Sequence, residues 1–156
     1  MATTTLPAFL DALAAALVLR AGLAGVAVFT CPVRPEELGD EAIELADTVE
    51  VTQGRAAMSS TDVEESYEVK GSVIVFRTAK PGASAINTAA KAARDRATAI
   101  IEEVTDEVSG NATMSATVRD VTIAAQSWSQ GYAAESQLGR FCRIEFTLRC
   151  EAHVTP

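Results

Sequence analysis

The stretch FCRIEFTLRCEAHV, residues Phe141 to Val154, decides the fold class of this 156-residue chain. Apolar and polar residues alternate through it with period two, the spacing at which successive side chains of a β-strand point to opposite faces of a sheet. One face carries Cys142, Ile144, Phe146, Leu148, Cys150, Ala152 and Val154. The other face is largely polar, so the pattern predicts a strand with one face in the core and one face outside it.

The rest of the chain supplies further strands and one hairpin. Apolar runs or alternation indicate strands at Val26–Thr30, Ala42–Leu45, Val49–Val51, Glu65–Arg77 and Thr117–Ser127. The second half of Glu65–Arg77 is apolar on both faces, which favours a central position in the sheet. Turn residues gather in Ser129–Gly139 between the last two strands, so we expect those strands to pair as a hairpin.

Two segments have the period of amphipathic helices. Pro7–Leu19 repeats apolar residues at helical spacing, and Thr5 is placed to cap it. This helix holds a single charge, so we expect it to be covered on more than one side, by the sheet or by another subunit. Ala85–Val108, with Ser84 as its cap, has a long alanine-rich stripe that allows close approach to a sheet.

The polar side of the second helix carries its charges in an unfavourable order. Lys91, Arg94 and Arg96 lie early in the helix, and four acidic residues lie late. That order opposes the helix dipole, which favours acids at the start and bases at the end. Two explanations stay open from the sequence: the charges are solvated, or a neighbouring subunit meets them.

The order of these elements predicts an α+β fold. No repeated strand–helix–strand unit is present, so we expect a mainly antiparallel sheet of about four to five strands, packed by the N-terminal helix and one long central helix. At 156 residues the chain has the length of one domain with its own core. We therefore assign residues 1–156 to a single α+β domain.

Negative charge is concentrated in one part of the chain. The formal net charge is −8, while residues 36–65 hold ten acidic residues and one basic residue, a net charge of −9. We name residues 36–65 the acidic segment; its composition disfavours nucleic-acid binding, which needs Lys and Arg at the phosphates. Within it, Thr52–Asp62 is polar and contains glycine. We expect a mobile loop or hairpin tip there, cleaved by protease in the free protein and protected on assembly.

Membrane insertion and secretion are both disfavoured by the sequence. The apolar stretch Asp11–Arg34 would place Arg20 near the middle of a membrane, which is energetically costly. A signal peptide needs basic residues before its apolar stretch, and none precedes Asp11. Cys142 and Cys150 lie on one strand about 26 Å apart, and a disulfide needs Cα atoms within about 7 Å. We expect a soluble, unsecreted protein with cysteines in the core or, for Cys31, at a strand end.

No arrangement typical of catalysis or metal binding is present in the sequence. The one histidine, His153, lies on the polar face of the last strand, where a surface position is favoured over a catalytic role. The acidic segment lacks the ligand spacing of a calcium loop, and nucleotide-binding and hydrolase motifs are missing. We expect no enzyme activity, catalytic residue, cofactor or metal. The single tryptophan, Trp128, is an interface anchor or a core residue.

The order of segments carries a family resemblance. A short N-terminal helix (LPAFLDALAAALVLRAGL) runs into a strand ending at a proline (GVAVFTCPV), and an acidic stretch follows (EAIELADTVEV). A strand and turn lead into an alanine-rich helix (YEVKGSVIVFRTAKPGASAINTAAKAARDRATAIIEEV), and an arginine-bearing strand closes the chain (GRFCRIEFTLRCEAHV). This arrangement, over nearly the whole chain, resembles the tail terminator family of long-tailed bacteriophages, of the kind found in phages of actinobacteria.

The resemblance implies a structural virion protein without catalytic residues. Such a protein caps the phage tail tube as a hexameric ring, ends tube polymerisation and forms the head-proximal joining surface. Its partners are other copies of the chain, the tail tube protein and a head-completion or connector protein, with no membrane and no sequence-specific nucleic acid. It is located in the host cytoplasm during assembly and at the head-proximal end of the tail in the virion. Two alternatives stay open: a head–tail joining or neck connector protein, and a small ligand-binding α+β domain.

A ring needs two lateral faces of unlike character that meet head to tail. The acidic segment and the polar face of the last strand are the two candidates that the sequence offers. The residues that we expect to contact neighbours or the tube are Glu44, Asp47, Glu50, Arg55, Arg143, Glu145 and Arg149.

Overall fold

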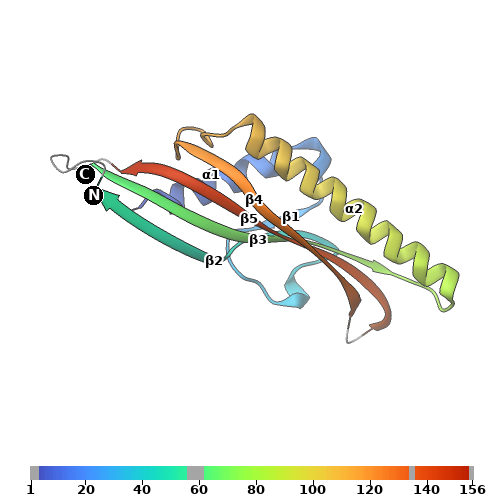
Figure 1. Cartoon of the computed structure of the whole chain (residues 1–156). Coiled ribbons are helices and arrows are strands. Elements are labelled where there is room, and N and C mark those ends of the chain that lie inside the picture. The colour runs from blue at the N-terminus through green and yellow to red at the C-terminus, as the bar shows by residue number, and fades with distance from the viewer. Residues whose placement is uncertain (1–3, 56–61, 134–135, 155–156) are drawn as a thin grey trace.

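The computed structural model of the chain describes residues 4–55, 62–133 and 136–154, without the side chains of residues 46, 47, 133, 136 and 137. It shows one five-stranded sheet with two helices on the same face (Figure 1). The helices are α1 (Leu6–Val18) and α2 (Ala83–Gly110), with short 3₁₀ turns η1 (Ala21–Leu23) and η2 (Pro35–Glu37). The strands are β1 (Ala27–Phe29), β2 (Glu41–Arg55), β3 (Val63–Thr78), β4 (Asp120–Ala133) and β5 (Ser136–Val154).

The strands lie in the order β1-β2-β3-β5-β4. β1 is parallel to β2, and the other neighbouring strands are antiparallel. The predicted α+β fold is therefore confirmed, with its mainly antiparallel sheet, N-terminal helix and long central helix. β3 and β5 occupy the middle of the sheet, and β4 and β1 lie at its two edges.

A single strand, β2, replaces the two short strands expected at Ala42–Leu45 and Val49–Val51. A bulge between Leu45 and Thr48 joins the two parts. The bulge holds two residues that have no partner on β3. Successive side chains alternate between the two faces of a strand, so two extra residues leave the apolar residues before and after the bulge on the same face of the sheet. The first four residues of the expected loop Thr52–Asp62 belong to β2, and residues 56–61 lie outside the described part of the chain.

The turn region expected at Ser129–Gly139 is too long, because β4 extends to Ala133 and β5 begins at Ser136, while residues 134–135 lie outside the described part of the chain. The hairpin pairing of the two strands is confirmed. Gly131 pairs with Phe141, and a Cβ on this glycine would lie 2.7 Å from a ring carbon of Phe141. The glycine therefore makes room for a neighbouring ring and does not mark a turn. Trp128 and Tyr132 consequently lie on a strand.

The core lies between the sheet and the two helices. The apolar face predicted for the last strand is buried along its whole length, from Cys142 to Val154. The helix α1 buries Phe9, Leu13 and Leu17, and α2 buries Ala89, Ala93, Ala97, Ile100, Ile101, Val104 and Val108. Alanines in the first half of α2 let that half lie close to the strands, as the sequence predicts.

The three cysteines are free, and two of them belong to the core. Cys142 and Cys150 are buried as expected, and burial raises the pKa of the Cys150 thiol to about 12. Cys31 is exposed, just beyond β1, so of its two expected positions the strand end is the one observed. Trp128 is half exposed, which excludes the core position considered for it.

Both predicted helix caps are wrong in their contacts. Thr5 precedes α1 as expected, but its hydroxyl donates to Oε2 of Glu65 at 2.9 Å and does not cap the helix. Ser84 lies inside α2, which begins after Gly82. Gly82 has a φ of +112°, a conformation that residues with a Cβ rarely adopt, so the glycine and not the serine sets the start of the helix.

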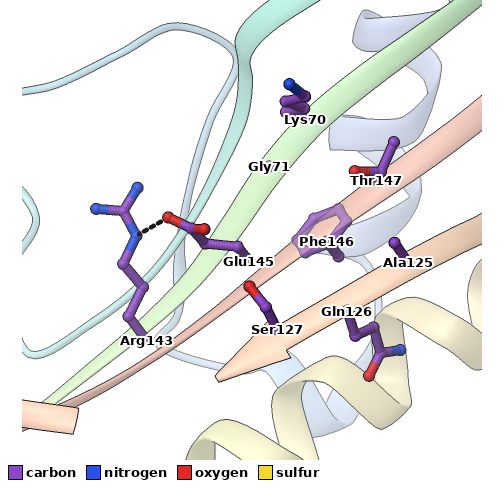
Figure 2. A pocket seen from close by; sticks show the side chains of 9 residues that line it. All are labelled: Lys70, Gly71, Ala125, Gln126, Ser127, Arg143, Glu145, Phe146 and Thr147. Carbon is purple, nitrogen blue, oxygen red and sulfur yellow. Dashed lines mark ion pairs between the residues drawn. The ribbon is translucent and has the colours of Figure 1, made fainter. Parts of the chain in front are cut away.

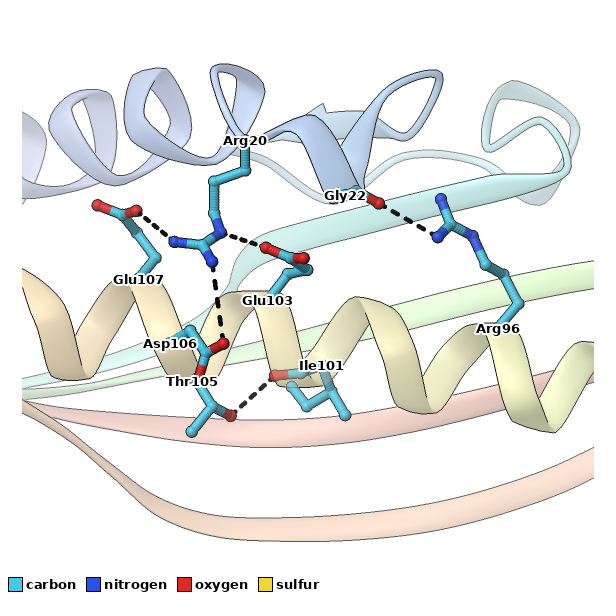
Figure 3. A network of polar contacts seen from close by, with 8 residues as sticks. All are labelled: Arg20, Gly22, Arg96, Ile101, Glu103, Thr105, Asp106 and Glu107. Carbon is cyan, nitrogen blue, oxygen red and sulfur yellow. Dashed lines mark hydrogen bonds and ion pairs between the residues drawn. The ribbon is translucent and has the colours of Figure 1, made fainter.

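Several charges of α2 are compensated within the chain (Figure 3). Arg20, in the turn after α1, pairs with Glu103 and, at 3.0 Å from Nη1 to Oε2, with Glu107. Arg96, earlier in the helix, pairs with Glu41 of β2 at 2.9 Å. For these residues neither solvation nor a neighbouring subunit explains the charge order. The ion pairs instead attach α2 to the turn after α1 and to the start of β2.

Candidate functional site

The face of the sheet opposite the helices is the largest surface that the predicted contact residues share. We name it the open face and define it by Glu50, Glu68, Lys70, Arg143, Glu145, Thr147 and Arg149, whose side chains follow the polar phase of β2, β3 and β5. The segment that contains η2 lies on this side of the sheet, below β2 and β3 in Figure 1. The open face is therefore a polar surface formed by three neighbouring strands of the sheet, and the segment around η2 lies on the same side.

One row of the open face consists of charged residues. Glu50, Glu68 and Arg149 lie directly opposite one another on β2, β3 and β5. Nη2 of Arg149 is 2.8 Å from Oε1 of Glu68. Within the described residues Glu50 forms no ion pair. Such an exposed pair contributes about 0.2–1 kcal/mol to stability, so its charges remain available to a partner at small cost.

A shallow hollow of about 260 Å³ lies on the open face beside this row (Figure 2). Its charged lining residues are Lys70, Arg143 and Glu145, and Nε of Arg143 is 3.3 Å from Oε1 of Glu145. Ser127 and Thr147 add hydroxyl groups. This lining offers two cations, one carboxylate and hydrogen-bonding groups, a set suited to a polar contact between proteins.

The predicted contact residues do not form one cluster. Glu50, Arg143, Glu145 and Arg149 share the open face, as their positions on β2 and β5 require. Arg55 is exposed at the end of β2, on the helix-bearing side by its pairing with Val63.

Two of the predicted contact residues need separate mention. Glu44 is buried, and its Oε2 accepts a hydrogen bond from the Val33 N–H at 3.1 Å. This carboxylate holds the segment after β1 against β2, so in the single chain it presents no free surface. The Asp47 side chain lies outside the described part of the structure.

Sequence reasoning missed one important carboxylate, Glu65. Its side chain is 2% exposed, and Oε2 accepts hydrogen bonds from the Thr5 N–H at 2.8 Å and from the Thr5 hydroxyl. Oε1 accepts a hydrogen bond from the Gln53 amide at 3.0 Å. The signal was present in the sequence, because Glu65 is in phase with Tyr67 and Val69, which face the core. Glu65 belongs to the architecture and joins α1 to the sheet.

The described residues contain no group of three or more His, Cys, Asp or Glu side chains placed to hold a metal ion. His153 is exposed on the open side of β5, opposite Glu64. Over the same described part of the chain, no helix is long and apolar enough to cross a membrane.

The chain matches no protein-family model, and no curated protein matches it.

Proposed function

We propose that this protein is a structural virion protein that caps the phage tail tube as a hexameric ring. The ring ends tube polymerisation and forms the surface that joins the tail to the head. The observation that carries the proposal is the order of elements: α1, β1, an acidic stretch along β2, β3 leading into the long α2, and the closing β4–β5 hairpin. This is the order on which the resemblance to tail terminators rests.

The two flanks of the sheet support a head-to-tail ring because they differ in chemistry. On the β1 side, η2 and the following loop carry the exposed acidic residues Glu36, Glu37 and Asp40. On the β4 side, an edge strand of small and polar residues carries two exposed aromatic residues, Trp128 and Tyr132. Unlike flanks favour a contact between different surfaces of successive copies over a two-fold dimer.

The open face supplies a third surface, which we assign to the tail tube or to the connector. None of its charged residues faces a helix of the same chain, and Glu50, Arg149 and Glu145 are exposed. The sheet fixes the backbone positions from which these side chains project, so the spacing of the charges on the open face is set before binding. Complementary charges on a partner then determine orientation and the rate of association.

Electron microscopy of the tail tube protein, polymerised with and without this chain, tests the proposal. We expect shorter tubes that end in a ring when the chain is present, and tubes of open length without it. Tubes that grow without restriction and carry no terminal density would overturn the proposal. Binding to portal or head complexes, with no effect on tubes, would replace it with a neck connector.

Charge reversal tests the role of the open face in the same assay. Arg149→Glu places a third carboxylate beside Glu50 and Glu68, and Arg143→Glu places a second one beside Glu145, so both variants should reduce capping. Lys91→Glu is the matched control, since Lys91 is an exposed cation on α2, on the other side of the molecule. Unchanged capping by both arginine variants would remove the open face from the proposal.

A further inference from the structure

The outer edge of β4 combines a free strand edge with exposed aromatic residues. Trp128 is 50% exposed and Tyr132 is 68% exposed, although their four-residue spacing places both on the helix-bearing face. Trp128 pairs across the sheet with the buried Ile144, so only the edge position leaves it uncovered. Large aromatic residues beside unpaired backbone groups are typical of a surface that another protein covers.

An open groove of about 710 Å³ lies at the opposite flank of the sheet. Its apolar lining includes Ala24, Ala27 and Leu38. Its charged lining consists of Glu37, Asp40 and the ion pair of Glu41 with Arg77, so two of its three carboxylates lie outside that pair. These residues come from the turn before β1, from β1 itself, from the segment around η2 and, for the ion pair, from β2 and β3. The groove is wide enough for an aromatic side chain and has carboxylates on its rim.

The aromatic edge and the groove lie at the same height along the strands. Ser129, the residue after Trp128, belongs to the cross-strand row that passes through β5, β3 and β2 and ends at Ala27 in the groove. A copy placed beside the first in the direction across the strands therefore brings Trp128 to the level of the next copy's groove. Such a contact joins unlike surfaces of successive copies head to tail, the kind of contact from which a ring is built.

Charges at the two flanks are complementary at that same height. Arg94 of α2 donates to the side-chain oxygen of Gln130 at 3.1 Å, and within the described residues it forms no ion pair. The row of Gln130 ends at Glu41 on β2, the residue after the exposed Asp40. One flank of the chain thus carries a cation without a carboxylate partner among the described residues, and the other flank carries acidic residues at the same height. The cation of one copy can therefore meet the acidic residues of the next copy.

We propose that the β4 edge of one copy docks on the β1 flank of a second copy, with Trp128 in the groove and Arg94 beside Asp40. This inference rests on the ring of the proposed function and identifies its lateral contact. The start of the acidic segment then forms part of the surface that binds the neighbouring copy, and β4 of that neighbouring copy supplies the aromatic residue that enters the groove. The open face stays available for the tube or the connector.

Site-specific crosslinking tests the contact directly. Ala24→Cys and Ser129→Cys are made in separate chains that also carry Cys31→Ser, mixed with tail tube protein and treated with a short bismaleimide. We expect a crosslinked dimer, because the two positions meet across the contact. Thr122→Cys in place of Ser129→Cys is the matched control: it is equally exposed on β4 but lies at the height of Arg149, away from the groove.

Two sets of substitutions test the chemistry of the contact. Trp128→Ala should weaken self-association by about 30-fold, a typical cost of truncating a buried interface tryptophan. Val51→Ala, at another exposed apolar residue on β2, should have no effect. Arg94→Glu and Asp40→Arg should each weaken self-association, and the two together should restore it. An additive loss in the double variant would overturn the proposed charge contact.

The outcomes separate this contact from the proposed function. Capped tubes without the Ala24–Ser129 crosslink, or with equal crosslinking at Thr122, would overturn the contact and leave the function standing. The crosslink without capping would support the contact and overturn the function. Failure to self-associate under any condition, with or without tubes, would overturn both.

Discussion

Glu65 should be one of the most important residues for the stability of this fold, although it belongs to the acidic segment, whose composition suggests surface residues. The Thr5 N–H donates to its Oε2 at 2.8 Å, and the Thr5 hydroxyl donates to the same atom at 2.9 Å. The amide of Gln53 donates to Oε1 at 3.0 Å. Replacing Glu65 therefore removes the hydrogen bonds that this carboxylate makes to the start of α1 and to β2.

These hydrogen bonds set the size of the expected loss in the free energy of unfolding. A hydrogen bond to a charged group contributes about 1.5–3 kcal/mol, and each buried donor left unpaired costs about 1–3 kcal/mol. Glu65→Ala removes the acceptor of the two half-buried Thr5 donors and of the amide of the exposed Gln53, so we expect a loss of about 2–4 kcal/mol in the free energy of unfolding. Glu65→Gln keeps the shape and one oxygen, and its loss should be about 1–2 kcal/mol.

The pH dependence has a defined sign. Burial acts to raise the pKa of Glu65, but hydrogen bonds from Thr4, Thr5 and Gln53 outweigh burial and lower the pKa below its ordinary value of 4.5. A carboxylate with a lowered pKa in the folded state stabilises the protein above its ordinary pKa, and this contribution is lost as the pH falls through the lowered value. The difference between wild type and Glu65→Gln should thus be full at pH 7 and shrink below about pH 4.5.

Urea unfolding followed by circular dichroism at pH 7 and in acid is the assay. Glu64→Gln is the matched control, because Glu64 is the exposed neighbour on the opposite face of β3. Equal midpoints for wild type, Glu64→Gln and Glu65→Gln at pH 7 would refute the reasoning. A deficit of Glu65→Gln that stays constant into acid would refute the assigned charge of Glu65 while leaving its hydrogen bonds in place.

Three further predictions concern packing, ion pairing and thiol chemistry. Gly71→Ala should lose about 1–3 kcal/mol in urea unfolding, because its Cβ would lie 2.7 Å from the Phe146 ring and 2.8 Å from a backbone carbonyl oxygen. Arg20→Ala should lose about 1–3 kcal/mol by leaving two half-buried carboxylates of α2 side by side, with a smaller loss in high salt that thermal unfolding would reveal. Maleimide should label Cys31 alone in the native protein and reach the buried Cys150 only after unfolding, as mass spectrometry would show.

Period-two alternation in the sequence predicts correctly which face of β5 is buried. The composition of the region between β4 and β5 predicts the ends of these two strands wrongly. Alternation reports burial directly, since each side chain of a central strand faces either the core or the outside. β4 is an edge strand whose second half is polar and exposed on both faces, so it has no apolar phase to detect. Its glycine and serines therefore predict a turn when only the sequence is considered. In the structure Gly131 is a strand residue that accommodates a ring.

The acidic segment shows why a count of charges does not describe a surface. Glu65 and Glu44 are buried and hydrogen-bonded. Glu41 is paired with Arg77 and Arg96, whose hydrogen bonds lower the pKa of Glu41 against the opposing effect of burial. These carboxylates hold elements of the fold together. The charge that the segment presents to a partner is therefore smaller than −9 and is concentrated around η2 and along the open face.

Strand order determines which surfaces can meet in a ring, and no local pattern in the sequence encodes it. The sequence offers the acidic segment and the last strand as lateral partners, yet β5 lies between β3 and β4, and its polar side belongs to the open face. The flank opposite the acidic segment is β4, with Trp128 at its exposed edge. In the proposed ring, contacts between copies and contacts along the tail use different residues. Trp128→Ala should therefore reduce self-association first, whereas Arg149→Glu should reduce binding to the tube and leave self-association intact.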